Sequence, residues 1–172
     1  MIFLTVGTQF SFDRLVKEID RLRGDGVIED EVFGQIGESG YLPQNFDYVK
    51  SLDKESFDGY VRDCSAIISH AGMGSITAAL DIMKPLLVMP RLKKYGEVVN
   101  NHQVGIARKF DELGHLMAVF SEDDLEDKIK QLDGFVPVTR KSNPEAVADR
   151  IKGFLDEINP TSASLRRAGC KD

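Results

Sequence analysis

The chain has 172 residues, which is enough for a single domain with a buried core. Its formal net charge of −6 argues against a nucleic-acid-binding protein, because such proteins usually carry a basic face. No apolar run reaches the length of about 18 residues that a membrane-spanning helix needs, and residues 1–6 lack the basic n-region of a signal peptide. The two cysteines, Cys64 and Cys170, show no metal-ligand spacing and suit a reducing compartment.

The first half of the chain alternates strand patterns with helix patterns. The apolar run Ile2–Val6 predicts a buried strand, which Gly7 ends. Apolar residues from Phe12 to Leu22 then recur with the helical period, so a helix is predicted to about Gly24 or Gly26. Further strands are predicted at residues 31–36, 46–49 and 65–69, and further helices at residues 56–62 and from Gly72 to Lys84-Pro85.

The second half continues the alternation. Leu86–Met89 predicts another apolar strand, which Pro90 ends, and residues 91–100 predict a polar, basic loop. The remaining predicted elements are a helix that runs to Gly114, a strand at 116–120, a helix that starts at Ser121-Glu-Asp-Asp, and a final helix from Asn143-Pro144 to Ile158.

Six apolar strands that alternate with helices predict an α/β fold, a Rossmann-like parallel sheet of about six strands with helices on both faces. The predicted domain covers residues 1–158, and residues 159–172 are expected to form a disordered tail. Ligands of such sheets bind beyond the carboxyl ends of the strands, where the strand order switches. We therefore expect the loops that begin at Gly7, His70 and Pro90-Arg91 to meet in one cleft.

A glycine turn follows the fourth predicted strand and is the first candidate site. Gly72 and Gly74 open the next helix, whose first N–H groups are unpaired and attract phosphate. Glycine lets the backbone approach a ligand closely, and His70 and Ser75 add side-chain donors. The stretch predicts a diphosphate site. The alternative is a plain strand–helix connection that binds nothing, because the pattern is not the full GxGxxG fingerprint.

The loop at residues 90–103 is the second candidate site. It combines cations, a carboxylate and three amides at the start of a helix. Amide and imidazole groups suit sugar hydroxyls, which both donate and accept hydrogen bonds. The alternative is a solvated surface loop with Asn101 as a helix cap.

No compact catalytic or metal-binding cluster is evident in the sequence. His70, His102 and His115 lack zinc-ligand spacing, so no metal site is predicted. The acidic runs at residues 29–31 and 122–124 are interpreted as solvated surface charges. No residue stands out as a general base, and the catalytic residues stay unassigned.

Several stretches together carry a family resemblance. They are Thr5-Val-Gly-Thr-Gln9 with Phe12-Asp13-Arg14, His70-Ala-Gly-Met-Gly-Ser75, Lys84-Pro-Leu-Leu-Val-Met-Pro90, and Lys94-Tyr-Gly-Glu97 with Asn101-His-Gln103. In order and spacing they resemble the glycosyltransferase family 28 C-terminal domain over about residues 1–135. More narrowly, they resemble the small donor-binding subunits of two-part glycosyltransferases, of the bacterial exopolysaccharide type and of the eukaryotic chitobiosyl-diphosphodolichol-forming type.

The resemblance implies the C-terminal half of a GT-B fold, which holds a UDP-linked sugar as donor with no metal and no other cofactor. It implies that the diphosphate is bound by Gly7, Thr8, Gln9, His70, Gly72, Gly74 and Ser75, and the sugar by Glu97, Asn101, His102 and Gln103. The chain departs from the family at Ala78, where many relatives have a glutamate that binds the ribose. Thr77, Asp81 or Glu97 are the candidates to replace it.

The implied function is that of an inverting hexosyltransferase subunit in exopolysaccharide biosynthesis, active only with a partner. The implied partner is a membrane-anchored subunit that binds a lipid-linked saccharide acceptor and holds this chain at the cytoplasmic, inner face of the membrane. The alternative is a non-catalytic, regulatory nucleotide-sugar-binding module, which Ala78 and the absence of an evident base favour. An NAD-binding protein is disfavoured, because GxGxxG does not follow the first strand.

Overall fold

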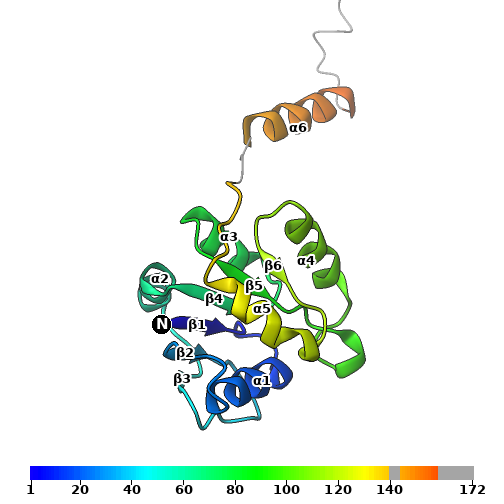
Figure 1. Ribbon diagram of the computed structural model, residues 1–172. Coiled ribbons are helices and arrows are strands. Elements are labelled where there is room, and N and C mark those ends of the chain that lie inside the picture. Colours follow the sequence, from blue (N-terminus) through cyan, green and yellow to red (C-terminus); the bar gives the residue numbers. More distant parts are fainter. Residues whose placement is uncertain (140–143, 159–172) are drawn as a thin grey trace, which may run out of the picture. The chain divides into compact units, whose positions relative to one another are not determined.

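The computed structural model describes residues 1–139 and 144–158. Within them, six parallel strands form one sheet in the order β3-β2-β1-β4-β5-β6 (Figure 1). The strands are β1 (Ile2–Thr5), β2 (Val32–Gln35), β3 (Asp47–Val49), β4 (Ala66–Ser69), β5 (Leu86–Val88) and β6 (Met117–Ala118). The predicted Rossmann-like α/β fold is confirmed.

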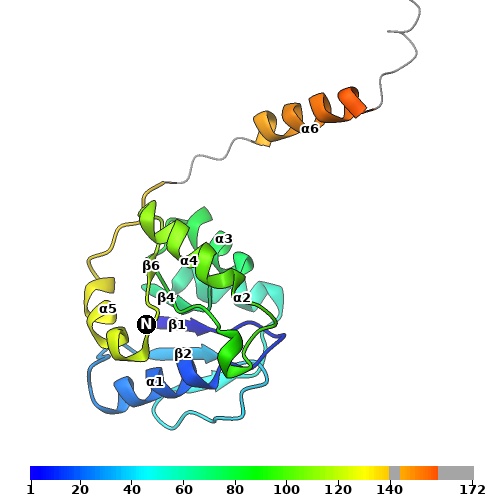
Figure 2. The same cartoon turned by 90° about the vertical axis from the view of Figure 1, so that its right-hand side faces the viewer.

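Helices cover both faces of this sheet, as predicted. Helices α1 and α5 pack on one face, and α2, α3 and α4 pack on the other (Figures 1 and 2). The helices are α1 (Asp13–Gly24), α2 (Lys54–Asp63), α3 (Met73–Asp81), α4 (His102–Glu112), α5 (Leu125–Leu132) and α6 (Pro144–Ile158), with short 3₁₀ helices η1 (Lys93–Tyr95) and η2 (Glu122–Asp124).

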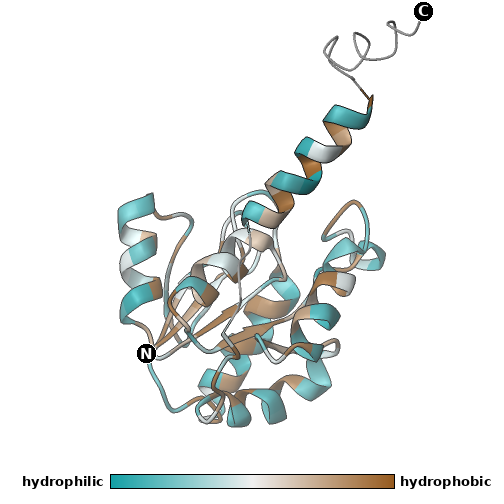
Figure 3. Ribbon diagram, turned by 90° about the horizontal axis from the view of Figure 1, so that it is seen from above, coloured by the Kyte–Doolittle hydropathy of each residue, from teal (hydrophilic) through white to brown (hydrophobic). Residues whose placement is uncertain are grey.

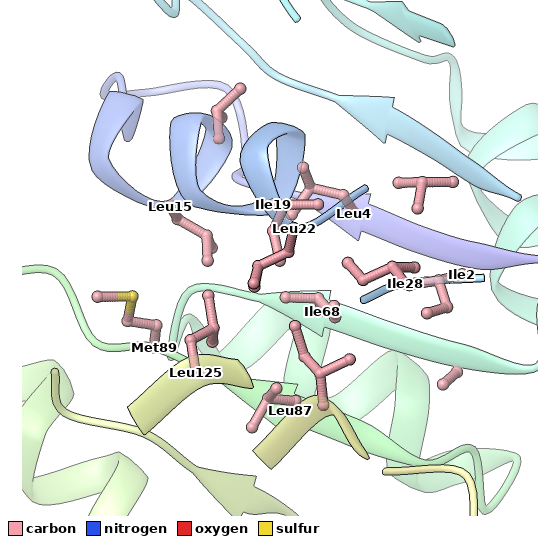
Figure 4. Close-up of a cluster of buried hydrophobic side chains, with 14 of the residues drawn as sticks. Ile2, Leu4, Leu15, Ile19, Leu22, Ile28, Ile68, Leu87, Met89 and Leu125 are labelled. Atoms are coloured by element: carbon pink, nitrogen blue, oxygen red, sulfur yellow. The ribbon is translucent and has the colours of Figure 1, made fainter. Parts of the chain in front are cut away.

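The core consists of two apolar clusters, one on each side of the strands. Successive side chains of a strand point to opposite faces. Accordingly Ile2 and Leu4 of β1 join the cluster under α1 and α5, whereas Phe3 between them joins the cluster under α2, α3 and α4. Figure 4 shows the first cluster, with α1 side chains directed at the strands, and Figure 3 shows the strands as the brown, apolar centre of the fold. Burial on both faces explains why the strands read as continuous apolar runs.

The strand order reverses direction between β1 and β4. The chain moves outward from β1 through β2 to β3, and then returns to add β4, β5 and β6 on the other side of β1. The loops that follow β1 and β4 therefore diverge at their shared edge and leave a crevice between them. This is where the predicted glycine turn lies.

Residues 1–139 form one compact unit, and α6 belongs to a second unit, residues 140–172. The compact unit ends before the predicted domain boundary at residue 158, so the assignment of α6 to the same domain stays a prediction. The predicted tail, residues 159–172, lies outside the described residues. None of the described helices is both long and apolar enough to cross a membrane.

Candidate functional site

A cleft of about 740 Å³ lies at the carboxyl edge of the sheet, at the strand-order switch. The loop after β1, the turn between β4 and α3, the residue after Pro90 and the start of α4 all line it. Nine of the residues that the sequence assigned to the donor are among the lining residues, namely Gly7, Thr8, Gln9, His70, Gly72, Gly74, Ser75, His102 and Gln103. The predicted meeting of three loops is confirmed.

The His70 ring lies between two glycines that leave room for it. A Cβ atom at Gly7 would lie 3.1 Å from His70 Cε1, and one at Gly72 would overlap His70 Nε2. Gly7 also has a φ of +72°, a conformation that other residues rarely adopt. The two glycines therefore place an imidazole ring in the wall of the cleft.

His70 is neutral at pH 7. Burial and the nearby positive charge of Arg91 lower its pKa to about 4. The Ser69 hydroxyl donates its proton to the Thr5 carbonyl (2.7 Å), so the Ser69 oxygen, 3.3 Å from His70 Nδ1, accepts from that nitrogen. Nδ1 therefore carries the proton and Nε2 a lone pair. His70 is predicted to donate to the diphosphate, and donation through Nε2 would require a second proton on the ring.

This neutral histidine predicts a pH dependence of stability. The ring takes up its proton near pH 4 when folded and near pH 6.5 when unfolded, so between these values the unfolded chain binds more protons. The free energy of unfolding is therefore expected to fall by up to about 3 kcal/mol as the pH drops from 6.5 to 4. Urea denaturation of the wild type and of His70→Gln at several pH values isolates this contribution. Parallel pH profiles of the two proteins would contradict it.

The first turn of α3 presents free backbone donors to the cleft. Gly72 is the N-cap and supplies no side-chain hydrogen bond, and no acidic residue occurs in the first turn. The first backbone hydrogen bond within the turn is donated by Ile76 to Gly72. The N–H groups of Met73, Gly74 and Ser75 precede it, at the positive end of the helix dipole. A Cβ atom at Gly74 would meet no atom within 4 Å, so the cleft is open there.

Arg91 is a lining residue to which the sequence reasoning gave no role. It is 3% exposed, and its Nη2 donates to the carbonyl oxygens of Val6 (2.6 Å) and Phe10. Its backbone N–H donates to Gln103 Oε1 (3.1 Å). Arg91 thus ties the loop after β1 to the start of α4. The sequence held one signal that could have identified Arg91 as a site residue. It directly follows the strand that Pro90 ends, and residues after strand ends face the ligand in this fold.

Two predicted sugar-binding residues have other partners in the structure. Glu97 is 8% exposed and accepts from Arg14 Nε (2.8 Å) and Nη2 (2.9 Å) and from Leu92 N (2.8 Å). Asn101 accepts from Lys93 N (2.8 Å), and its side chain does not cap α4, although Asn101 is the N-cap residue. Neither residue lines the cleft. Both side chains shape the loop, so the structure lends no support to direct sugar contacts from them.

Ala78, where many relatives have a ribose-binding glutamate, lies in the wall of the cleft. Ala78 lines the cleft together with Lys54 and Asp58 of α2, which pair with each other at 2.7 Å. Glu97, one of the residues expected to replace the missing glutamate, is engaged by Arg14. Thr77 and Asp81 line an adjoining hollow of about 700 Å³ rather than the cleft itself.

No three His, Cys, Asp or Glu side chains in the described ranges lie close enough together to hold a metal ion. Around the glycine turn the cleft offers backbone N–H groups, the amide of Gln103 and the buried guanidinium of Arg91, whereas Asp53, Lys54 and Asp58 of the α2 side contribute charged groups to its wall. The groups around the glycine turn suit an anion and hydroxyl groups.

The fold and the cleft define a Rossmann-like domain with a glycine turn of unpaired backbone N–H groups at the switch point. Residues 1–154 match the glycosyltransferase family 28 C-terminal domain, and the chain belongs to this family.

Similar proteins include UDP-N-acetylglucosamine transferase subunits named ALG13. The human protein is 33% identical over 126 residues, which cover 67% of this chain and 10% of the human chain. The Candida glabrata protein is 36% identical over 91 residues, covering 51% of this chain and 43% of that protein. The chain thus spans only a tenth of the human relative and less than half of the fungal one.

Solved structures of glycosyltransferases share the fold. An NMR structure of ALG13 has a TM-score of 0.58 and 21% identity, and covers 84% of this chain and 91% of that chain. MurG of Acinetobacter baumannii has a TM-score of 0.56 and 15% identity, and covers 78% of this chain and 42% of that chain. At these identities the likeness concerns the fold.

Proposed function

We propose that this chain is the donor-binding subunit of a two-part glycosyltransferase and that the cleft holds the diphosphate of a UDP-linked sugar. The observation that carries the proposal is the convergence of unpaired N–H groups, close-approach glycines and a buried guanidinium in one cleft at the switch point. N-acetylglucosamine, the sugar in the relatives' names, is the first donor to test among UDP-hexoses. We also propose that the transferred sugar enters exopolysaccharide biosynthesis.

The proposed reaction joins an acceptor hydroxyl oxygen to the anomeric carbon of the sugar and inverts that carbon. The bond from the anomeric carbon to the diphosphate breaks, and its electron pair stays on the diphosphate. The hydroxyl proton passes to a general base. Fixed N–H donors at the start of α3 would stabilise the charge that grows on the leaving diphosphate, with no metal required.

The general base is proposed to come from a partner. The pKa of His70 in the cleft wall is lowered to about 4, and so weak a base removes an alcohol proton poorly. A single Rossmann-like unit also forms only one wall of a transferase cleft. We therefore propose a second, membrane-anchored subunit that binds a lipid-linked saccharide and holds this chain at the cytoplasmic face of the membrane.

The test is UDP release. The chain is mixed with UDP-N-acetylglucosamine, UDP-glucose or UDP-galactose and with membranes that contain the candidate partner. We expect UDP release that depends on chain, partner and acceptor together. UDP-sugar binding without release would favour the alternative, a non-catalytic regulatory module, for which Ala78 in place of the ribose-binding glutamate is the supporting feature. Absence of both binding and release would contradict the proposal.

His102 is expected to affect the choice of sugar. It is exposed, lines the cleft beside Gln103, and its backbone N–H donates to Asn100 Oδ1 (3.0 Å). His102→Ala is expected to leave the affinity for UDP within about twofold, because no diphosphate donor is removed, while changing the ranking of UDP-sugars. Calorimetry with UDP and with the three UDP-sugars checks this. An equal loss for UDP and the UDP-sugars would assign His102 to the diphosphate instead.

A further inference from the structure

Arg91 is a buried cation without a carboxylate in contact. It is 3% exposed, yet no carboxylate oxygen of the described residues lies within 4.0 Å of its guanidinium. The other largely buried arginine near the cleft, Arg14, differs in this respect, because it pairs with Glu97 (2.8 Å) and Glu122 (3.3 Å). A buried charge is costly unless a counter-charge and hydrogen bonds compensate it. Glu97 acts on Arg91 only at longer range, and the Phe12 ring centroid lies 5.3 Å from its guanidinium carbon, so no carboxylate in contact balances this buried charge.

The hydrogen bonds of Arg91 are also incomplete. Guanidinium groups carry five N–H donors. Nη2 donates to the Val6 and Phe10 carbonyls, whereas Nε is buried and has no partner within the described chain. Nη1 makes no hydrogen bond to a described residue either. The loop after β1 thus uses only one of the three guanidinium nitrogens, so holding this loop does not account for the whole group.

The group lies where an anion is expected. Arg91 lines the same cleft as His70 and the first turn of α3, and its charge acts on the His70 ring. It follows β5, which pairs with β4, so it stands beside the turn that carries the free N–H groups of α3. Burial, which the more distant charge of Glu97 only partly offsets, lowers the pKa of Arg91 to about 10 and leaves the guanidinium charged at pH 7.

We propose that Arg91 is the counter-charge of the donor diphosphate, a binding residue that neutralises the leaving group as the sugar departs. The inference rests on the proposed function, because it requires the diphosphate in this cleft. A diphosphate against the first turn of α3 would supply the negative charge that no carboxylate in contact with Arg91 provides. Hydrogen bonds between ionised partners are roughly twice as strong as neutral ones, so the effect on binding is large.

The test compares uridine, UMP and UDP, which differ only in their phosphates. Arg91→Met removes the charge and keeps much of the volume. It is expected to weaken UDP binding by about 30-fold, UMP binding by less, and uridine binding not at all. Arg91→Lys restores the charge and is expected to recover part of the UDP affinity. Arg108→Met is the matched control, because Arg108 is an exposed arginine of α4 outside the cleft.

The outcomes distinguish the inference about Arg91 from the proposed donor-binding function. If Arg91 only holds the loop after β1, Arg91→Met weakens all three ligands by the same factor and Arg91→Lys does not help, which overturns the inference. Unchanged UDP binding by Arg91→Met also overturns it and leaves the proposed function standing. A wild-type chain that binds no UDP defeats the proposed function and the inference together.

A measurement on the wild type covers the case in which Arg91→Met does not fold. The Nε–H resonance of Arg91 is followed by NMR as UDP or uridine is added. UDP is expected to shift this resonance and slow its exchange with water, and uridine is expected to do neither. A resonance that UDP leaves unchanged would overturn the inference without any variant.

Discussion

Gly74→Val is expected to weaken UDP binding by about 100-fold or more and to leave the fold intact. The residue is exposed, belongs to the first turn of α3 and lines the cleft, and a Cβ atom there meets no protein atom within 4 Å. The valine side chain would therefore occupy ligand space and keep a phosphate from the N–H groups of the turn. Loss of two charge-assisted hydrogen bonds suffices for an effect of this size. Stability should not fall, because valine has a higher helix propensity than glycine.

Gly105→Val provides the matched control for this substitution. Gly105 is likewise an exposed helical glycine with open space around its Cβ position, but it belongs to α4 and does not line the cleft. Calorimetry with UDP and urea denaturation are run on both variants. Equal UDP affinities for the two variants would contradict a diphosphate site at the first turn of α3.

Glu97→Gln is expected to lower the free energy of unfolding by about 3–5 kcal/mol, the cost of removing one partner of a buried ion pair. Arg14 and Glu97 are 12% and 8% exposed and share two hydrogen bonds. Burial alone would lower the pKa of Arg14, but Glu97 and Glu122 outweigh it and raise that pKa. The glutamine would leave the arginine charge largely buried and less well compensated.

An exposed pair serves as the control for this loss. Glu126 and Lys130 of α5 lie 2.6 Å apart, but their side chains are 39% and 56% exposed. Glu126→Gln is therefore expected to leave the free energy of unfolding almost unchanged, because water screens an exposed ion pair. Urea denaturation measures both variants, and similar losses for the two would mean that the Arg14–Glu97 pair does not anchor the loop.

The sequence predicted the sheet well because burial on both faces leaves a direct signature. Every predicted strand is present, although β6 comprises only Met117–Ala118 of the predicted stretch 116–120. As an edge strand, β6 pairs with β5 alone, and β5 itself comprises only Leu86–Val88. Helix α2 begins earlier than predicted, at Lys54, because Asp53 accepts a hydrogen bond from Ser56 N (2.8 Å) and caps it.

The candidate site was only partly predictable from the sequence. Strand ends and glycines have local patterns, so the turn at residues 70–75 could be found. Glu97 could not be assigned, because its partner Arg14 lies 83 residues earlier in the chain. The neutral state of His70 and the missing partners of Arg91 depend on burial and on the neighbouring strand, which no local pattern records.

The most direct test of a diphosphate site at the first turn of α3 is an amide ¹H–¹⁵N NMR titration of the wild-type chain with UDP and, separately, with uridine. The account predicts that UDP shifts the amide resonances of Met73, Gly74 and Ser75 and that uridine leaves them nearly unchanged, because only UDP places phosphate oxygens against the first turn of α3. UDP shifts confined to another hollow, such as the one lined by Arg23, Gln44 and Asp47, would contradict it.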